Sequence, residues 1–136
     1  MGTFREDYKS GTAKEDELLD ILKAFFKDDI VKDKNKYAIL DYKGEHYYEM
    51  KSRNVKATAY PDTIITKKKI DYYNKLNTDK HLYLIFPFTD CIKYIQYNKE
   101  VFDNFKCEEF VRHQRGDFND KKQLYYFIPI NALLEV

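Results

Sequence analysis

The sequence predicts one mixed α/β domain, and three observations support this class. An amphipathic helix is predicted from Gly11 onward, because Leu18, Leu22 and Phe25 recur at helical spacing. A β-hairpin is predicted over residues 37–53, and the apolar run 81–88 has the length of a central strand. Helices bury their apolar faces economically by packing on a sheet. The order helix, hairpin, helix, strand therefore indicates an α/β or α+β fold with a mixed central sheet.

Length and composition set the frame for this prediction. The 136 residues suit a single domain over residues 11–136, preceded by a frayed segment 1–10. The 24 basic and 23 acidic residues nearly cancel, so net charge alone does not indicate a nucleic-acid binder. No run approaches the ~20 apolar residues of a membrane span. Cys91 and Cys107 lack CxxC spacing and no secretory leader precedes them, which favours an intracellular protein with reduced thiols over a zinc site completed by His81 and His113.

The first helix carries acids near its start. Glu15 lies three and seven residues before Leu18 and Leu22, so it shares the face of the buried stripe. Either it partners the helix dipole and reaches out to solvent, or it points into a site. The charged segment 27–36 is predicted to be a loop, with Ile30 and Val31 beginning a short strand.

The hairpin has predicted arms over residues 37–42 and 46–51, joined by a turn in which Gly44 supplies a positive φ. Side chains alternate along a strand, so Glu49 and Lys51 emerge on one face and Tyr48 on the other. A three-residue loop over residues 43–45 pairs residue 42 with residue 46 and puts Asp41 on the face of Glu49 and Lys51. A two-residue loop would put Asp41 on the opposite face.

The rest of the chain adds one helix and more strands. Pro61 precedes a second predicted helix, which begins at Asp62 or Thr63 and ends near Leu76. Strands follow over residues 81–88 and 91–97, then a loop with a short helix over residues 98–107. Strands over residues 109–115 and 124–130, around a polar turn, complete an extra C-terminal β-hairpin.

Carboxylates on neighbouring strands favour metal-assisted phosphodiester hydrolysis. Asp41 and Glu49 can hold Mg²⁺ or Mn²⁺, because these ions take oxygen ligands. Lys51 can then neutralise charge developing on the phosphate, and Glu15 can reach the cluster through a metal-bound water. The acid-x-Lys triplet itself occurs about as often as chance allows, so the strand context carries the signal. The alternative is a solvated cross-strand charge pair.

The chain here resembles the PD-(D/E)xK nuclease superfamily, which includes restriction endonucleases and Holliday-junction resolvases. The resemblance rests on Gly11 and Glu15, Asp41, the stretch Glu49-Met50-Lys51-Ser52-Arg53 and a following helix with Lys69. It covers about residues 11–97, leaving 98–136 as an extension, and is closest to small members from large DNA viruses and phages. The core order implied is helix, β-meander, helix, strand, a restriction-endonuclease-like fold.

The resemblance implies a Mg²⁺-dependent DNA nuclease of the endo or exo type. Asp41 and Glu49 would be metal ligands, Lys51 the catalytic lysine, and Glu15 and Lys69 auxiliary residues, while Asp33 is an alternative first acid. Basic side chains near the site can contact the DNA backbone or form a solvated face: Arg53, Lys56, Lys67 and Lys68. Aromatic surface on the C-terminal strands suits a homodimer. The alternative function is an inactive nucleic-acid- or protein-binding module on the same fold.

Overall fold

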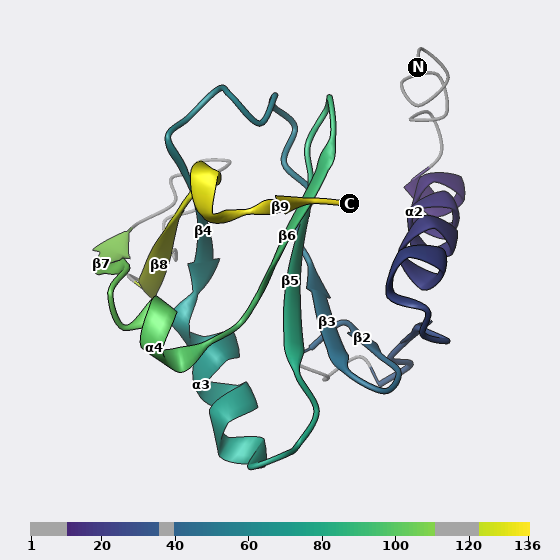
Figure 1. Ribbon diagram of the computed structural model, residues 1–136, viewed down its shortest axis with the longest axis horizontal. Helices are drawn as coiled ribbons and strands as arrows, with labels where there is room; N and C mark the ends of the chain where they lie inside the picture. Colours follow the sequence, from purple (N-terminus) through teal and green to yellow (C-terminus); the bar gives the residue numbers. More distant parts are fainter. Residues whose placement is uncertain (1–10, 36–39, 111–122) are drawn as a thin grey trace.

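A computed structural model describes residues 11–35, 40–110 and 123–136 of the chain. Its main sheet has six strands in the order β1-β2-β3-β5-β6-β9, and a second sheet has the order β4-β8-β7. In the main sheet β3 pairs parallel with β5, and the other pairings are antiparallel. The predicted α/β class with a mixed central sheet is therefore confirmed (Figure 1).

The helices and strands follow one another closely along the chain. The helices are α2 (Gly11–Phe26), α3 (Lys67–Leu76) and α4 (Lys99–Phe102), with a 3-10 turn at Ile130–Ala132. The strands are β1 (Val31–Lys32), β2 (Tyr42–Lys43), β3 (Tyr47–Met50), β4 (Asp62–Thr66), β5 (Leu82–Pro87), β6 (Ile92–Gln96), β7 (Lys106–Phe110), β8 (Gln123–Pro129) and β9 (Leu134–Glu135).

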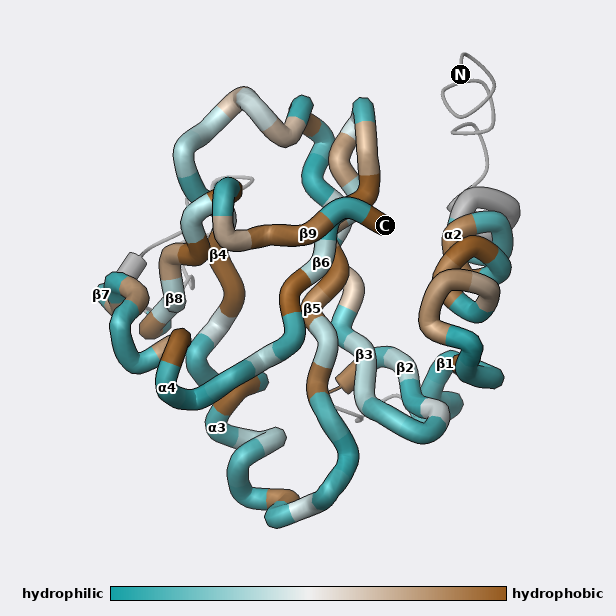
Figure 2. The backbone as a smooth tube through the Cα atoms, in the orientation of Figure 1, coloured by the Kyte–Doolittle hydropathy of each residue, from teal (hydrophilic) through white to brown (hydrophobic). Residues whose placement is uncertain are grey.

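The central strand β5 separates two apolar clusters. On one face, Ile85 packs with Tyr48 and with Leu22 of α2. On the other face, Leu84 and Phe86 pack with residues of α3, β4 and β8. Each fully buried aliphatic side chain contributes about 1.5–3 kcal/mol of hydrophobic free energy. The predicted central strand covered on both sides is therefore confirmed, and Figure 2 shows hydrophobic segments along β4 and β5.

The second predicted helix is wrong in its first turn. Residues 62–66 form strand β4, in which Thr63 and Ile65 are buried and their neighbours are less so, and α3 begins only at Lys67. This alternation is typical of a strand, and the β-branched run Thr-Ile-Ile-Thr favours one. The partner of β4 is β8, and the paired residues lie 59 to 67 positions apart in the chain, from Thr66 with Tyr125 to Asp62 with Pro129.

The C-terminal segment is joined to both sheets. The predicted pairing of its two long strands is confirmed by β7 and β8, although β7 begins at Lys106 and residues 111–122 lie outside the described part. β8 also pairs with β4, and β9 pairs with β6 in the main sheet. The expected aromatic surface of these strands is wrong for Tyr125 and Tyr126, which are buried.

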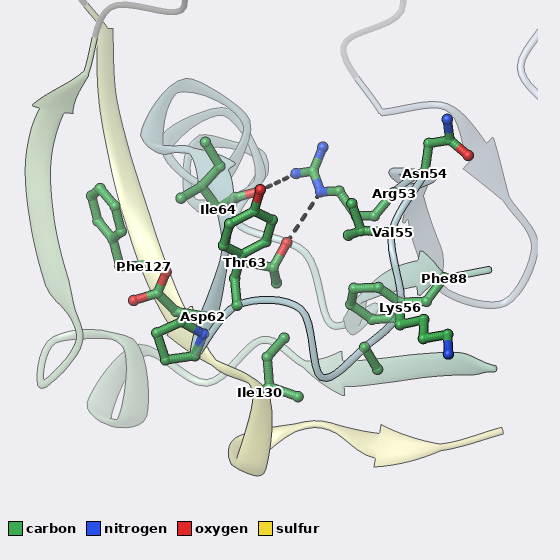
Figure 3. Close-up of a pocket in the computed structure, with 13 residues that line it drawn as sticks. Arg53, Asn54, Val55, Lys56, Asp62, Thr63, Ile64, Phe88, Phe127 and Ile130 are labelled. Carbon is green, nitrogen blue, oxygen red and sulfur yellow. Dashed lines mark hydrogen bonds between the residues drawn. The ribbon is translucent and has the colours of Figure 1, made fainter. Parts of the chain in front are cut away.

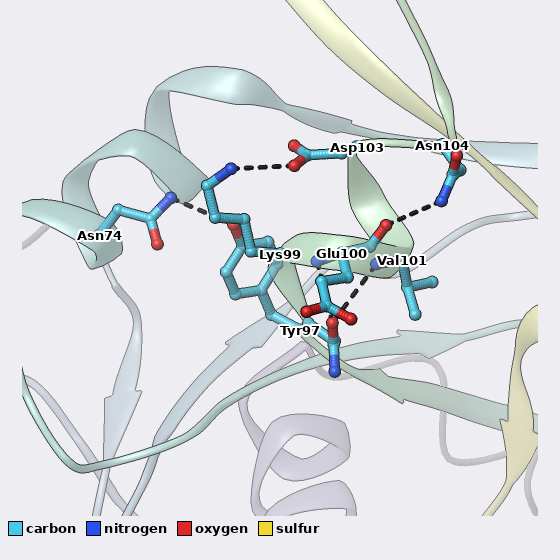
Figure 4. Close-up of polar contacts among 8 residues, drawn as sticks. Asn74, Tyr97, Lys99, Glu100, Val101, Asp103 and Asn104 are labelled. Atoms are coloured by element: carbon cyan, nitrogen blue, oxygen red, sulfur yellow. Dashed lines mark hydrogen bonds and ion pairs between the residues drawn. The ribbon is translucent and has the colours of Figure 1, made fainter.

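The short helix α4 shows how a single turn is held in place. Asn98 caps it, because its side-chain oxygen accepts hydrogen bonds from the backbone N–H groups of Glu100 and Val101. Asn104 donates to the carbonyl oxygen of Glu100 (2.9 Å), and Lys99 pairs with an oxygen of Asp103 (2.9 Å) (Figure 4). The predicted short helix in this segment is confirmed.

Candidate active site

Strand β3 turns adjacent residues to opposite faces of the main sheet. Tyr48 and Glu49 are both buried, Tyr48 in the cluster beneath α2 and Glu49 on the face covered by α3. The course of the strand continues past Met50, because the N–H groups of Lys51 and Arg53 donate to the carbonyl oxygens of Ile85 and Pro87. Alternation therefore puts Glu49, Lys51 and Arg53 on one face.

The hairpin register differs from the predicted one by one residue on each strand. Tyr42 pairs with Tyr48 and Lys43 with Tyr47, so the three-residue loop is 44–46 rather than 43–45. One step further along this register Asp41 stands opposite Glu49. Asp41 therefore still lies on the same face as Glu49 and Lys51, as predicted. The register shifts by one residue on each strand, two in total, and a shift of two does not move a side chain to the other face. Residues 36–39 of the first predicted arm lie outside the described residues.

Gly44 allows the Asp28 carboxylate to lie directly against the backbone of the turn. It does not have the predicted positive φ. A Cβ atom at this position would lie 2.6 Å from both carboxylate oxygens of Asp28. That carboxylate accepts hydrogen bonds from the Glu45 N–H (3.0 and 2.9 Å) and from the Tyr48 hydroxyl (2.7 Å). A side chain at position 44 would displace the carboxylate that fixes the loop.

The Glu49 carboxylate is fully buried and faces two lysines. Its Oε2 atom lies 2.5 Å from Lys69 Nζ and 3.9 Å from Lys51 Nζ. Its Oε1 atom accepts a hydrogen bond of 3.2 Å from the backbone N–H of Asp41. Burial raises the pKa of the Glu49 carboxyl above its ordinary value of 4.5, and the charge of Asp41 adds to this, although Lys69 and Lys51 oppose the shift. A buried carboxylate held by two cations is suited to exchange them for another cation.

Tyr42 packs with Tyr48 beneath α2, on the face of the hairpin opposite Glu49, but it is close enough to the acids to be affected by their charge. Burial, and to a smaller extent the negative charges of Glu15, Asp41 and Glu49, together raise its pKa to about 12. Sequence reasoning did not identify this tyrosine as a neighbour of the acids. Its position directly after Asp41 and its aromatic character in the hairpin were the available signals.

Glu15 and Asp33 stand at the border of this acidic group. The Glu15 side chain is 54% exposed and lies 3.6 Å from Lys32 Nζ, which agrees with the alternative in which it reaches solvent. Asp33 is paired with Lys43 at 3.7 Å, and its N–H donates to the Asp41 carbonyl oxygen (2.9 Å). Asp41 is therefore the acid closest to Glu49 in the hairpin, and Asp33 carries a partner of its own.

Asp41 and Glu49 fit a divalent cation that takes only one or two of its ligands from the protein. Among the described residues, no three His, Cys, Asp or Glu side chains come together as a metal cluster. Mg²⁺, however, is commonly held by one or two carboxylates together with substrate phosphates and water. Asp41 and Glu49 would supply that set, and the ammonium groups of Lys69 and Lys51 now balance the charge of Glu49. Cys91 and Cys107 are both free thiols, and His113 of the alternative zinc site lies outside the described residues.

The three lysines that open α3 point to different partners. Lys69 is largely buried against Glu49, Lys67 pairs with Asp71 (2.9 Å), and Lys68 is exposed. An α-helix turns 100° per residue, so only one of three adjacent residues can face the site. Strand β4 ends at Thr66, directly before these lysines. The residue at which the strand gives way to the helix therefore determines that Lys69 is the lysine that faces Glu49.

Arg53 is anchored to β4. Its Nε donates to Thr63 Oγ1 (3.1 Å) and its Nη2 to the Ile64 carbonyl oxygen (2.5 Å) (Figure 3). Thr63 was not predicted as a partner, because the sequence placed it at a helix start. Lys56, three residues further along, is exposed and remains available to solvent.

Comparison with known protein families gives a match over almost the whole chain. The model of the family described as "Phage putative PDDEXK endonuclease" matches residues 3–136. No curated protein and no solved structure shows a significant match. Within the described residues, no helix is long and apolar enough to cross a membrane.

Proposed function

We propose that this chain, which belongs to the family of phage PD-(D/E)xK endonucleases, hydrolyses the phosphodiester bonds of DNA with the help of Mg²⁺ or Mn²⁺. The observation that carries the proposal is the buried Glu49 carboxylate with Lys69 and Lys51 at 2.5 and 3.9 Å. A buried charge is costly unless it is paired, and such sites are commonly functional. Because the substrate is DNA, we also propose an intracellular site of action.

Asp41 and Glu49 would hold the metal ion, with Glu15 joining through a bound water. The chemistry that a bound divalent ion supplies is polarisation of the phosphate and a lowered pKa of bound water. Lys51 stabilises the negative charge that develops on the phosphate, and its partly exposed ammonium group can reach a substrate. Lys69 is a positioning residue, since its contact with Glu49 holds that carboxylate in place when no ion is bound.

The DNA backbone would lie across the basic side chains near this face. Lys56 and Lys68 are exposed, and Lys67 is partly exposed despite its pair with Asp71. These lysines serve phosphate contacts, which hold DNA without reading its sequence. Arg53, which is tied to β4 by its hydrogen bond to Thr63, supports this surface. A homodimer, which would allow two strands to be cut, stays a prediction.

A cleavage assay tests this function. Labelled duplex, nicked, single-stranded and four-way junction DNA, together with a closed circular plasmid, is incubated with Mg²⁺ or Mn²⁺. We expect metal-dependent cutting that falls about 100- to 1000-fold in Lys51→Ala, the size typical of losing one charge-stabilising group. Lys75→Ala, an exposed lysine at the end of α3, is the matched control and should cut normally.

The outcomes separate the proposal from its alternative. Cutting of the circular plasmid establishes an endonuclease, because an exonuclease needs a free end. No cutting of any substrate, combined with unchanged metal affinity in Glu49→Ala, would identify a binding module in which the lysines only neutralise a buried acid.

A further inference from the structure

Arg53 also lines a cavity of about 560 Å³. Asp41, Glu49, Lys51 and Lys69 do not line it. Its walls are the segment 53–57 after β3, residues 60–64 leading into β4, Phe88 after β5, and Phe127 and Ile130 near the end of β8 (Figure 3). Its volume is in the usual range for pockets that bind small organic groups.

The walls are held by hydrogen bonds at several points. The Ala57 N–H donates to Asp90 Oδ1 (3.0 Å), and the Thr89 N–H donates to the Val55 carbonyl oxygen (3.0 Å). The Ile130 N–H donates to the Pro61 carbonyl oxygen (3.0 Å), and Arg53 is tied to β4. A ligand entering the cavity therefore meets a site that is already formed, so little affinity is lost to ordering the protein.

The lining combines flat apolar surfaces with a few polar groups. Tyr60 contributes a ring that is 64% exposed at the wall, Phe127 adds a second ring, and Phe88 is a core residue that is only 2% exposed. Asn54 offers an amide and Asp62 a carboxylate. Aromatic rings stack on planar heterocycles, while amides and carboxylates hydrogen-bond to their edges. This combination suits a nucleobase better than an aliphatic ligand.

The position of the cavity connects it to the scissile phosphate. Arg53 lies two residues beyond Lys51 on the extended strand, a separation of roughly 6.6 Å along the backbone. Lys51 precedes Arg53 in the sequence and the exposed Lys56 follows it. Each of these lysines can contact a phosphate. A DNA strand whose phosphate is at Lys51 has its neighbouring nucleotide within reach of the cavity.

We propose that this cavity binds one unpaired nucleobase, from the nucleotide next to the scissile phosphate, with the base stacked on the ring of Tyr60. The inference rests on the proposed DNA substrate and narrows it to strands with an accessible base. In a perfect duplex the base must first leave the stack at a cost of a few kcal/mol, whereas single-stranded or mismatched nucleotides avoid most of that cost.

Amide chemical-shift titration tests this site with two matched probes. One is a deoxytrinucleotide and the other is the same trinucleotide with an abasic central residue, so the two carry equal charge. Both are added in EDTA, which prevents cutting, to the wild type, Tyr60→Ala and Tyr60→Phe. We expect the base-containing probe to bind wild type about 5- to 150-fold more tightly, with shifts at residues 54–57 and 60–64. Tyr60→Phe keeps this ratio, because it keeps the ring, and Tyr60→Ala loses most of it.

Other outcomes overturn the inference. Equal affinity of the two probes for the wild type, an unchanged ratio in Tyr60→Ala, or shifts confined to Asp41, Lys51 and Lys69 would each show that no base enters the cavity. The cleavage assay above distinguishes the two levels of failure. If the wild type cuts DNA but does not discriminate between the probes, only the base site is wrong. If it neither cuts DNA nor binds either probe, the proposed function fails as well.

Discussion

The two faces of β3 each hold a buried acid, and the two acids are satisfied in opposite ways. In the loop after α2, Asp28 accepts hydrogen bonds from the Tyr48 hydroxyl and from the Glu45 backbone N–H. Beneath α3, Glu49 is held chiefly by ion pairs with Lys69 and Lys51. The partners of Asp28 are fixed in the fold, whereas those of Glu49 stand at the ends of flexible side chains that can move aside.

The pKa values of the two acids follow this difference. Burial raises the pKa of the Asp28 carboxyl, but the hydrogen bonds from Tyr48 and from the backbone outweigh it, so its pKa falls below 3.8. Burial dominates at Glu49, where the lysines do not fully compensate, and its pKa rises above 4.5. An acid whose charge is fully satisfied stabilises a structure, while one whose charge is incompletely satisfied favours an added cation. This difference supports the proposal that Asp28 serves the architecture and Glu49 the chemistry.

The largest effect is expected for Glu49→Gln, which keeps the shape of the side chain and removes its charge. We expect metal-dependent cleavage to fall by at least about 100-fold, since a group acting on the metal and the phosphate is lost. The stabilisation that Mn²⁺ gives in a thermal unfolding scan should disappear with it. A variant that still gains stability from Mn²⁺ would move the metal site away from Glu49.

The next largest effect is expected for Lys69→Met, which removes the cation closest to Glu49 while keeping an unbranched apolar chain. The buried carboxylate then lacks its main partner, and we expect the free energy of unfolding to fall by about 3 kcal/mol in EDTA. Added Mn²⁺ should restore more stability in this variant than in the wild type, because it replaces a missing charge. Lys68→Met, at an exposed neighbouring position, should change little in urea unfolding. Equal Mn²⁺ effects in Lys69→Met and wild type would mean that Lys69 does not stand at the metal position.

A smaller effect on stability, and none on the chemistry, is expected for Asp28→Asn. The amide can accept only part of the hydrogen bonding now given to the carboxylate, and one of its N–H groups would face the Tyr48 hydroxyl or the Glu45 N–H. We expect a loss of about 1–3 kcal/mol in the free energy of unfolding. Cleavage per folded molecule, measured well below the melting temperature, should match the wild type. A specific loss of cleavage in this variant would contradict the division between the two faces.

This contrast also shows which features the sequence alone could predict. The alternation along β3 is local, so Tyr48 and Glu49 could be placed on opposite faces from residue spacing. Asp28 offered no such signal, because its partners Glu45 and Tyr48 lie 17 and 20 residues away, across a loop. In the sequence, Asp28 is one of several acids in a charged segment, and only the folded hairpin shows its hydrogen-bond partners.

The elements that cover Glu49 are set even more by contacts between residues far apart in the chain. The resemblance to a nuclease family pointed to Lys69, but its 2.5 Å contact requires α3 to begin at Lys67. Helix and strand patterns compete over residues 62–66, and pairing with β8 decides in favour of the strand. The cavity lined by Arg53 was beyond sequence reasoning, since its walls come from segments that are far apart in the chain.

The smallest effect, and the most direct comparison of the two acids, is the pH dependence of stability in EDTA. A depressed pKa, as at Asp28, contributes stability above the ordinary value of 3.8 that is lost as the pH falls through the folded pKa. A raised pKa, as at Glu49, contributes stability below 4.5 that is lost as the pH rises through the folded pKa. The difference between wild type and Asp28→Asn in urea unfolding should therefore shrink on acidification below 3.8. The difference between wild type and Glu49→Gln should instead shift in favour of the variant as the pH rises above 4.5. Parallel curves for the two variants would show that the acids do not differ in their charge balance, and the assignment of Glu49 to the chemistry would lose its electrostatic basis.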